Sequence, residues 1–193
     1  MKKIYLILFI GILFGACSRD EMDRTIFIPD EKDNKLPAYT EWGYNSFGAE
    51  YERDYFLASN EIVPCKIMYK DNKLHFYLSG VIRDGKEMTL IFSFPLNKIN
   101  EISDLLQLNN QKINLSNEDC TVSVFQYNNE IVLDVINGEL YFKRAQLLNI
   151  DDEINRVILS GVFELRFLQN GFPSTISNGR FDLGITKNVF YSY

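Results

Sequence analysis

The sequence predicts an all-β fold, an antiparallel β-sandwich of about nine strands. Aromatic residues make up 14% of the 193 residues, and such residues favour half-buried pleated surfaces over helices. From Asn45 onward, short runs alternate apolar and polar residues, with turn residues between them and no strand–helix–strand pattern. A calycin-like β-barrel with an internal apolar pocket is the alternative. Runs such as Leu90–Phe94 that are apolar on both faces favour the sandwich.

The first predicted hairpin turns at Arg83–Lys86, where an Asp-Gly pair is a strong turn signal. The runs on either side place their apolar residues on one face, at Leu74, Phe76, Leu78, Met88, Leu90, Phe92 and Phe94. We therefore expect these two runs to pair as neighbouring antiparallel strands.

Two further hairpins follow. One joins Cys120–Tyr127 to Glu130–Ile136 through two asparagines, which tolerate the left-handed conformations of tight turns. The other joins Glu139–Ile150 to Val157–Leu168. Gly161 interrupts the return strand of that hairpin and indicates a bulge or a close approach of another backbone.

The chain closes with one more strand, Thr175–Ile185, and contains one candidate helix. The segment Lys98–Leu108 is the only one whose apolar residues recur near helical spacing, at Ile99, Ile102, Leu105 and Leu106. No other helix is expected in the folded domain.

Residues 1–16 have the order of a secretory signal peptide. Lys2 and Lys3 precede the apolar run Ile4–Phe14, and the small residues Gly15 and Ala16 follow. The run is shorter than the roughly 20 apolar residues that span a bilayer, so a retained transmembrane helix is the weaker alternative. We therefore expect the chain to be exported.

The sequence Phe14-Gly15-Ala16-Cys17 resembles a bacterial lipobox, in which the cysteine thiol receives a diacylglycerol and cleavage occurs before it. Several acyl chains would hold the product on a membrane. A plain signal peptide with an incidental cysteine is the alternative. The tract Ser18–Asp23 is similar to the acidic tract that sends Bacteroidota lipoproteins to the cell exterior, and a solvated tether on the periplasmic face is the other interpretation.

Three regions are expected: a lipoprotein signal peptide at 1–16, the lipidated Cys17 with a flexible spacer over 17–44, and a single all-β domain over 45–193. The spacer prediction depends on polar composition, on Pro29 and Pro37, and on the charged run Asp30–Lys35. Its one apolar stretch, Thr25–Ile28, has an edge strand as the alternative.

The charge of the chain excludes one class of partner. The formal net charge is −6, and it becomes −8 on cleavage because Lys2 and Lys3 are the only charged residues of 1–16. Nucleic acids and anionic lipid headgroups are bound by cationic surfaces. No nucleic-acid partner is therefore predicted, and the anchor on Cys17 accounts for membrane attachment.

Three stretches, Leu36–Tyr51, Val157–Phe167 and Ile176–Ile185, together resemble a family of Bacteroidota lipoproteins of unknown function. Members carry an early Asn-Thr-Phe-Gly motif, a Ser-Gly-Thr-Phe strand and a closing Gly-Arg-Phe-Asp strand. The chain differs from those motifs at Ser46, Ala49 and Val162. The resemblance implies an all-β fold and assigns no catalytic residue. Within the closing motif, Arg180 and Asp182 are expected to form a charge pair on the outer face.

No catalytic residue, metal site or cofactor is predicted. The only histidine, His75, excludes a site with several histidine ligands, and its position opposite Leu74 and Phe76 indicates a solvent-facing strand residue. The acidic clusters lack the spacing of a calcium loop. A glycan hydrolase would need two carboxylates facing each other across a cleft, which the sequence leaves open.

Cys65 and Cys120 are the thiols that remain once Cys17 is lipidated. An oxidising compartment permits a disulfide between them, and two free buried cysteines are the alternative. A second cluster, Trp42, Tyr44, Tyr51 and Tyr55, is a candidate platform on which sugar rings stack, with capping of one end of the sandwich as the alternative.

These observations predict a non-enzymatic, membrane-anchored module of the outer membrane that binds a glycan or an outer-membrane protein outside the cell. A carrier of an apolar ligand in a calycin-like barrel is the alternative, and a glycan hydrolase is third.

Overall fold

A computed structural model of the protein describes residues 24–82, 85–150, 153–169 and 171–193. The predicted signal peptide and Cys17 lie outside the described residues. Within these residues the helical elements are two 3-10 helices, η3 (Ile102–Leu108) and η4 (Lys187–Val189). The strands are β1 (Ser46–Tyr51), β2 (Asp54–Leu57), β3 (Cys65–Lys70), β4 (Lys73–Ile82), β5 (Lys86–Pro95), β6 (Gln111–Asn114), β7 (Thr121–Gln126), β8 (Asn129–Val132), β9 (Asp134–Ile150), β10 (Glu153–Gln169), β11 (Phe172–Ile185) and β12 (Phe190–Ser192).

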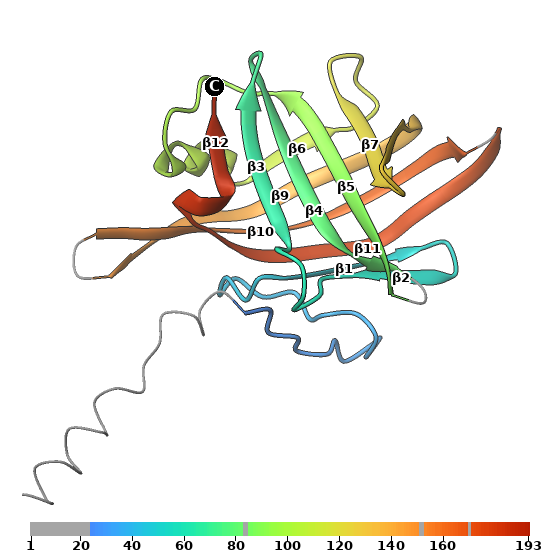
Figure 1. Cartoon of the computed structure of the whole chain (residues 1–193), viewed down its shortest axis with the longest axis horizontal. Coiled ribbons are helices and arrows are strands. Elements are labelled where there is room, and N and C mark those ends of the chain that lie inside the picture. Colours follow the sequence, from blue (N-terminus) through green and yellow to red (C-terminus); the bar gives the residue numbers. More distant parts are fainter. Residues whose placement is uncertain (1–23, 83–84, 151–152, 170) are drawn as a thin grey trace, which may run out of the picture.

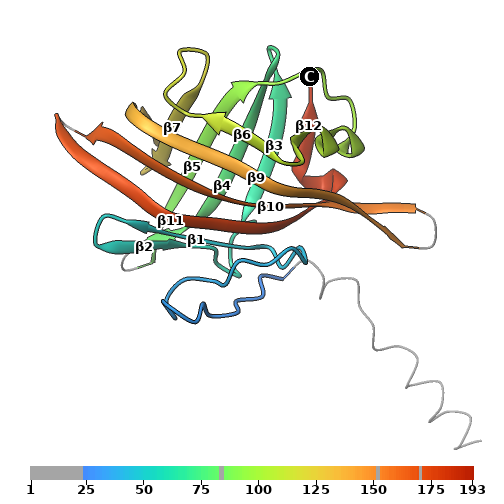
Figure 2. The ribbon, with the colours of Figure 1, turned by 180° about the vertical axis from the view of Figure 1, so that it is seen from behind.

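All twelve strands belong to one curled sheet, which confirms the all-β prediction. Its path runs β6-β9-β10-β11-β1-β2-β4-β5-β7-β8, with β3 on β4 and β12 on β3. Every pairing is antiparallel except that of β12 with β3. Strands β3, β4, β5 and β7 cross in front of β9, β10 and β11 as a second layer, and the view from behind reverses the order (Figures 1 and 2). The structure has more strands than the nine expected because β2, β6 and β12, of three or four residues each, are too short to show an alternation.

The three predicted hairpins are confirmed. β4 and β5 pair from Lys73 with Pro95 to Ile82 with Lys86. β7 pairs with β8, and β9 pairs with β10 over most of their length. The close approach predicted at Gly161 is also present. A Cβ there would lie 2.2 Å from the carbonyl oxygen of Tyr141, and the β9–β10 register shifts between Ser160 and Gly161.

The predicted helix is present but shorter, beginning at Ile102 instead of Lys98. The carboxylate of Asp104 accepts hydrogen bonds from the backbone N–H groups of Asn100 and Glu101, which fixes this start. Ile102, Leu105 and Leu108 are buried where η3 packs on β9 and β10. Within the described residues, none of the helices combines the length and apolar character that crossing a bilayer requires.

Phenylalanine rings from five strands fill the space between the layers. The ring centroid of Phe76 lies 5.2 Å from that of Phe181 and 5.5 Å from that of Phe142, and Phe92 lies 5.4 Å from Phe163. All five side chains are buried. Rings at these separations are in direct contact, so the interior of the fold is a packed core.

Residues 24–44, called the N-terminal segment below, are packed on the domain and are not the flexible spacer that their composition predicts. Leu36 is completely buried. Ile26 donates its N–H to the carbonyl of Tyr44, and the N–H of Ala38 binds the carbonyl of Ile28. The segment lies along β1 and β2 in both views (Figures 1 and 2). The apolar stretch Thr25–Ile28 thus pairs within this segment and does not form a strand of the sheet.

Candidate functional site

The candidate site is built around a bulge in β11. Between Phe163 and Leu165 of β10, the paired residues of β11 change from Gly179 to Ile176, so that two residues of β11, Ser177 and Asn178, lie opposite one residue of β10. Asn178 adopts a left-handed backbone with φ 53°. Bulges of this kind redirect side chains and often lie beside functional sites.

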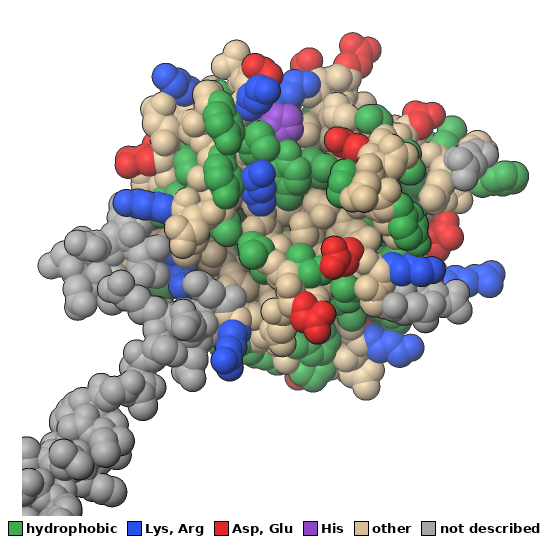
Figure 3. Space-filling model, in the orientation of Figure 1, with side chains coloured by type: hydrophobic (Ala, Val, Ile, Leu, Met, Phe, Trp, Pro, Cys, Tyr) green, Lys and Arg blue, Asp and Glu red, His purple; other side chains and the backbone are tan. Residues whose placement is uncertain are grey.

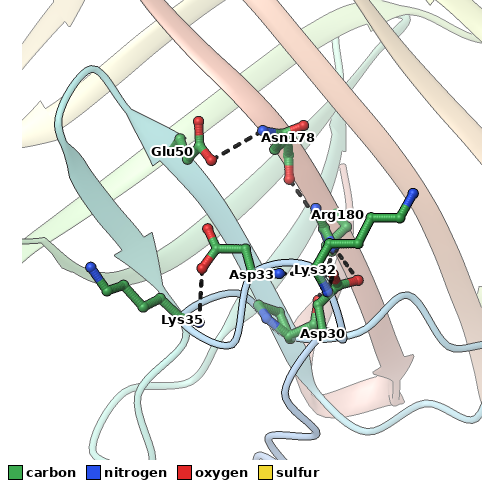
Figure 4. Close-up of polar contacts among 8 residues, drawn as sticks. Asp30, Lys32, Asp33, Lys35, Glu50, Asn178 and Arg180 are labelled. Atoms are coloured by element: carbon green, nitrogen blue, oxygen red, sulfur yellow. Dashed lines mark hydrogen bonds and ion pairs between the residues drawn. The ribbon is translucent and has the colours of Figure 1, made fainter.

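Both bulge residues contact Glu50 on the neighbouring strand β1. The Asn178 amide donates to Oε1 of Glu50 at 3.1 Å, and the Ser177 hydroxyl donates to Oε2 at 3.2 Å. The three polar side chains lie on the outer face of the sheet, and Figure 4 shows the Glu50–Asn178 contact. The bulge therefore presents an ordered carboxylate–amide pair toward solvent.

Arg180 connects this bulge to the N-terminal segment. Its Nη1 donates to Oδ2 of Asp30 at 2.8 Å, and its Nε donates to the backbone carbonyl of Asn178 at 3.2 Å (Figure 4). The guanidinium is partly buried between the two. Arg180 thus binds Asp30 and does not form the predicted charge pair with Asp182.

Asp30 also begins a tight turn. Its Oδ1 accepts the backbone N–H of Lys32 at 2.9 Å and that of Asp33 at 3.3 Å. The pKa of Asp30 lies below its usual value, mainly because of these two hydrogen bonds and further because of the charge of Arg180. The carboxylate is therefore ionised at neutral pH.

An open hollow of about 620 Å³ lies between this turn and β11, and we call it the β11 hollow. Tyr39 is part of its lining. The ammonium of Lys143 lies 4.7 Å from the Tyr39 ring centroid, and the Tyr39 hydroxyl donates to Glu41 at 2.8 Å. Burial, and then the hydrogen bond to Glu41, raise the pKa of Tyr39. The lining residues are Asp30, Glu31, Lys32, Asp33, Leu36, Ala38, Tyr39, Asn178 and Arg180.

A second, smaller hollow of about 370 Å³ lies on the other side of the bulge. Its polar lining includes Glu139, Glu164, Arg166 and Ser177. Because Ser177 lines one hollow and Asn178 lines the other, the two hollows adjoin at the bulge. Together they form an elongated polar surface across β9, β10, β11 and the N-terminal segment.

Asp182 holds the N-terminal segment on the sheet. Its side chain is buried, and it accepts hydrogen bonds from the Ser160 hydroxyl at 2.9 Å and from the Gly43 N–H at 2.7 Å. Its second carboxylate oxygen accepts the Thr40 hydroxyl and the N–H groups of Trp42 and Tyr44. The expected outer-face charge is therefore an internal acceptor for five donors.

The predicted aromatic platform is not assembled. Tyr51 is paired with Ile176, whereas the Trp42 N–H binds Asp182. Six positions of β11 separate these two points, about 20 Å along a strand. The Tyr51 ring instead packs on Phe167 with its centroid 6.4 Å away.

The other two aromatic residues of the predicted platform, Tyr44 and Tyr55, lie apart from each other. Tyr55 donates its hydroxyl to Asp33 at 3.1 Å, beside the β11 hollow, and the ammonium of Lys35 lies 5.2 Å from its ring centroid. Tyr44 is half-buried at the end of the N-terminal segment. Tyr39, which no sequence pattern identifies, is the aromatic residue that lines the hollow.

Cys65 and Cys120 are free thiols in the structure, so the possible disulfide is not formed. Cys65 begins β3, and Cys120 directly precedes β7, which is separated from β3 by β4 and β5. Three sheet spacings amount to about 14 Å. A disulfide needs Cα atoms within about 7 Å.

We expect the thiols of Cys65 and Cys120 to differ in reactivity. Burial raises the pKa of Cys65 to about 12, so a thiol-reactive dye at pH 8 should label the half-buried Cys120 first and Cys65 only after unfolding in urea. The Cys120→Ser variant, with Cys17 also replaced by serine, should then show no rapidly labelled thiol. Equal labelling of both thiols in the native protein, or none in urea, would contradict the structure.

The raised pKa of Cys65 also predicts a dependence of stability on pH. Because the folded state holds Cys65 neutral, the free energy of unfolding should fall as pH rises above 9, the ordinary thiol pKa.

His75 is not near the β11 hollow. Its Nδ1 lies 2.8 Å from the Ser93 hydroxyl on β5, and burial lowers the pKa of the imidazole. In the part of the chain that the structure describes, no group of three or more His, Cys, Asp or Glu side chains could hold a metal ion.

The β11 hollow offers hydrogen-bond donors and acceptors with nearly balanced charge. Lys32 and Arg180 face three carboxylates, and an amide and a phenol complete the set. On the face formed by β3, β4 and β5, charged side chains of both signs are scattered and form no single patch (Figure 3). Comparisons with protein-family models, with curated proteins and with solved structures found no match to the chain.

Proposed function

We propose that the protein is a lipid-anchored, non-enzymatic binding module of the outer membrane, and that the β11 hollow binds a hydroxyl-rich ligand such as a glycan. The lipobox-like sequence ending at Cys17 and the acidic tract after it support the anchor and the exterior location. The resemblance to Bacteroidota lipoproteins supports the same assignment.

The observation that carries the ligand proposal is the open hollow beside the β11 bulge. A glycan presents many hydroxyl groups, each of which both donates and accepts, and planar carboxylate, amide and guanidinium groups match them. Asp33 of the turn and Asn178 and Arg180 of β11 supply these groups, and Tyr39 supplies an apolar ring face. The near balance of charge favours a neutral ligand over a highly charged one.

The carrier function has less support than the binding module. A calycin-like carrier needs an enclosed apolar cavity, whereas the rings of Phe76, Phe142 and Phe181 are in mutual contact at the centre of the fold. A fatty acid would have to displace these rings. The hollows on the outer face are open and polar, so they suit the binding of a polar polymer better than that of an apolar small molecule.

A protein partner is the second candidate, and one observation favours it. Strand β8 pairs only with β7, so its other edge is open, and Ile131 and Val132 are exposed along it. An extended segment of another outer-membrane protein could add to such an edge by main-chain hydrogen bonds.

The glycan proposal is tested with the native lipoprotein in detergent micelles on an array of bacterial and host glycans. Asn178→Gly removes the amide while keeping the left-handed backbone, because glycine adopts φ 53° without strain. We expect this variant to bind the selected glycan about tenfold more weakly, the effect of roughly one lost hydrogen bond.

The matched control is Asn128→Gly. Asn128 also has a left-handed backbone, with φ 60°, but lies in the β7–β8 turn. It should bind like the unmodified protein. Failure of every glycan to bind, or equal affinity of the two variants, would rule out the β11 hollow as a glycan site.

A further inference from the structure

The N-terminal segment carries several exposed apolar side chains. Ile26, Phe27 and Ile28 are consecutive and 40–45% exposed, and Trp42 on the returning arm of the same segment is 71% exposed. Val63, which lines a shallow pocket together with Thr25, is 62% exposed. Single exposed apolar residues are ordinary, but several of them at one place mark an interaction surface.

The tether to the anchor ends at this surface. Because the N-terminal segment is packed on the domain, only seven peptide steps separate Cys17 from Arg24, a reach of at most about 25 Å. A free spacer running to Tyr44 would reach about 90 Å. A lipid on Cys17 therefore keeps Ile26, Phe27 and Ile28 close to the bilayer.

We infer that Ile26, Phe27, Ile28 and Trp42 contact the lipid bilayer to which Cys17 is attached, so that the domain lies on the membrane by its N-terminal segment. This inference depends on the proposed lipid anchor. Tryptophan and aliphatic side chains at the boundary between headgroups and acyl chains gain from burial of their apolar parts. The contact is apolar and not electrostatic, since the segment also carries Asp30, Glu31 and Asp33.

Trp42 gives a direct test because it is the only tryptophan of the chain. The native lipoprotein is reconstituted into phosphatidylcholine vesicles with or without lipids brominated near the headgroup end of the acyl chain. We expect the emission of Trp42 to be blue-shifted, relative to tryptophan in water, in both kinds of vesicle. The emission intensity should be lower by at least half in the vesicles that contain brominated lipid. Quenching by acrylamide added to the water phase should be weak.

Two variants distinguish direct contact of these apolar side chains with lipid from mere closeness of the domain to the membrane. Phe27→Ser should reduce the quenching by brominated lipid by about half or more, although the anchor is unchanged. Phe172→Ser, at an equally accessible aromatic residue 74% exposed in the β10–β11 hairpin, should leave it unchanged. Equal effects of the two variants would overturn the inference.

Flotation of the vesicles distinguishes failure of the inference from failure of the anchor. A protein that floats with the vesicles while Trp42 remains open to acrylamide and unquenched by brominated lipid is anchored but does not lie on the bilayer, which overturns the inference alone. A protein that does not float overturns the lipid anchor of the proposed function and the inference with it.

Discussion

Replacing Asp182 with alanine is expected to lower the free energy of unfolding by about 3 kcal/mol and to free the N-terminal segment from the sheet. The buried carboxylate accepts hydrogen bonds from the N–H groups of Trp42, Gly43 and Tyr44, and from two hydroxyls. Without it these donors either stay unpaired in the interior or move into water with the segment. Urea denaturation measures the first effect, and amide hydrogen exchange over residues 40–44 measures the second.

Two controls accompany this variant. Ser160→Ala removes one of the five donors and should lower the free energy of unfolding by about 1 kcal/mol. The amides of the N-terminal segment should stay protected from hydrogen exchange in this variant. Asp119→Ala, at an exposed position next to β7, should change the free energy of unfolding by less than about 0.5 kcal/mol. Unchanged exchange rates over residues 40–44 in Asp182→Ala would show that the carboxylate does not hold the segment.

The second large effect is expected for Phe76→Ala, which should lower the free energy of unfolding by about 3–5 kcal/mol. The Phe76 ring is completely buried and contacts Phe92, Phe142 and Phe181, which belong to three other strands. Its loss leaves a cavity that the surrounding strands fill only in part. Urea denaturation measures the change.

Phe172→Ala is the control for this variant. Because Phe172 is exposed, its replacement should change the free energy of unfolding only slightly. The cavity also gives a second measurement. Benzene should stabilise Phe76→Ala and leave the unmodified protein unaffected, since an apolar cavity of this kind takes up small hydrophobic molecules. A cost below about 1 kcal/mol for Phe76→Ala would show that the centre of the fold is loosely packed.

The longer strands could be predicted from the sequence because they carry a period-two pattern. Leu74, Phe76 and Leu78 alternate with more polar residues, and all three are buried as expected. The order of strands could not be predicted in the same way. β1 lies between β11 and β2, and its pairing with a strand more than 120 residues later leaves no local signal.

The packing of the N-terminal segment could not be predicted from the sequence for a related reason. Its residues are polar and include prolines, so composition alone indicates a spacer. Its binding partners, however, are Asp182 and Arg180 near the other end of the chain. The Gly-Arg-Phe-Asp motif is visible in the sequence, but its two charged residues bind the N-terminal segment and not each other.

The candidate site could be predicted only in part. Tyr55 belongs to the predicted aromatic group and contacts Asp33 beside the β11 hollow. Trp42 and Tyr51 are close in sequence but are held about 20 Å apart because β1 and its preceding turn are extended. Tyr39 and Asn178 come together only through the folding back of the segment, which no spacing in the sequence encodes.

The attachment of the N-terminal segment to Asp182 also decides how the protein would respond to mechanical force. If Cys17 carries the proposed lipid anchor, a force that pulls the domain away from the membrane enters the described chain at residue 24. The contacts of the segment with β11 bear this load before any strand of the sheet does. Detachment of the segment would lengthen the chain between Cys17 and the sheet by about 70 Å without unfolding the core.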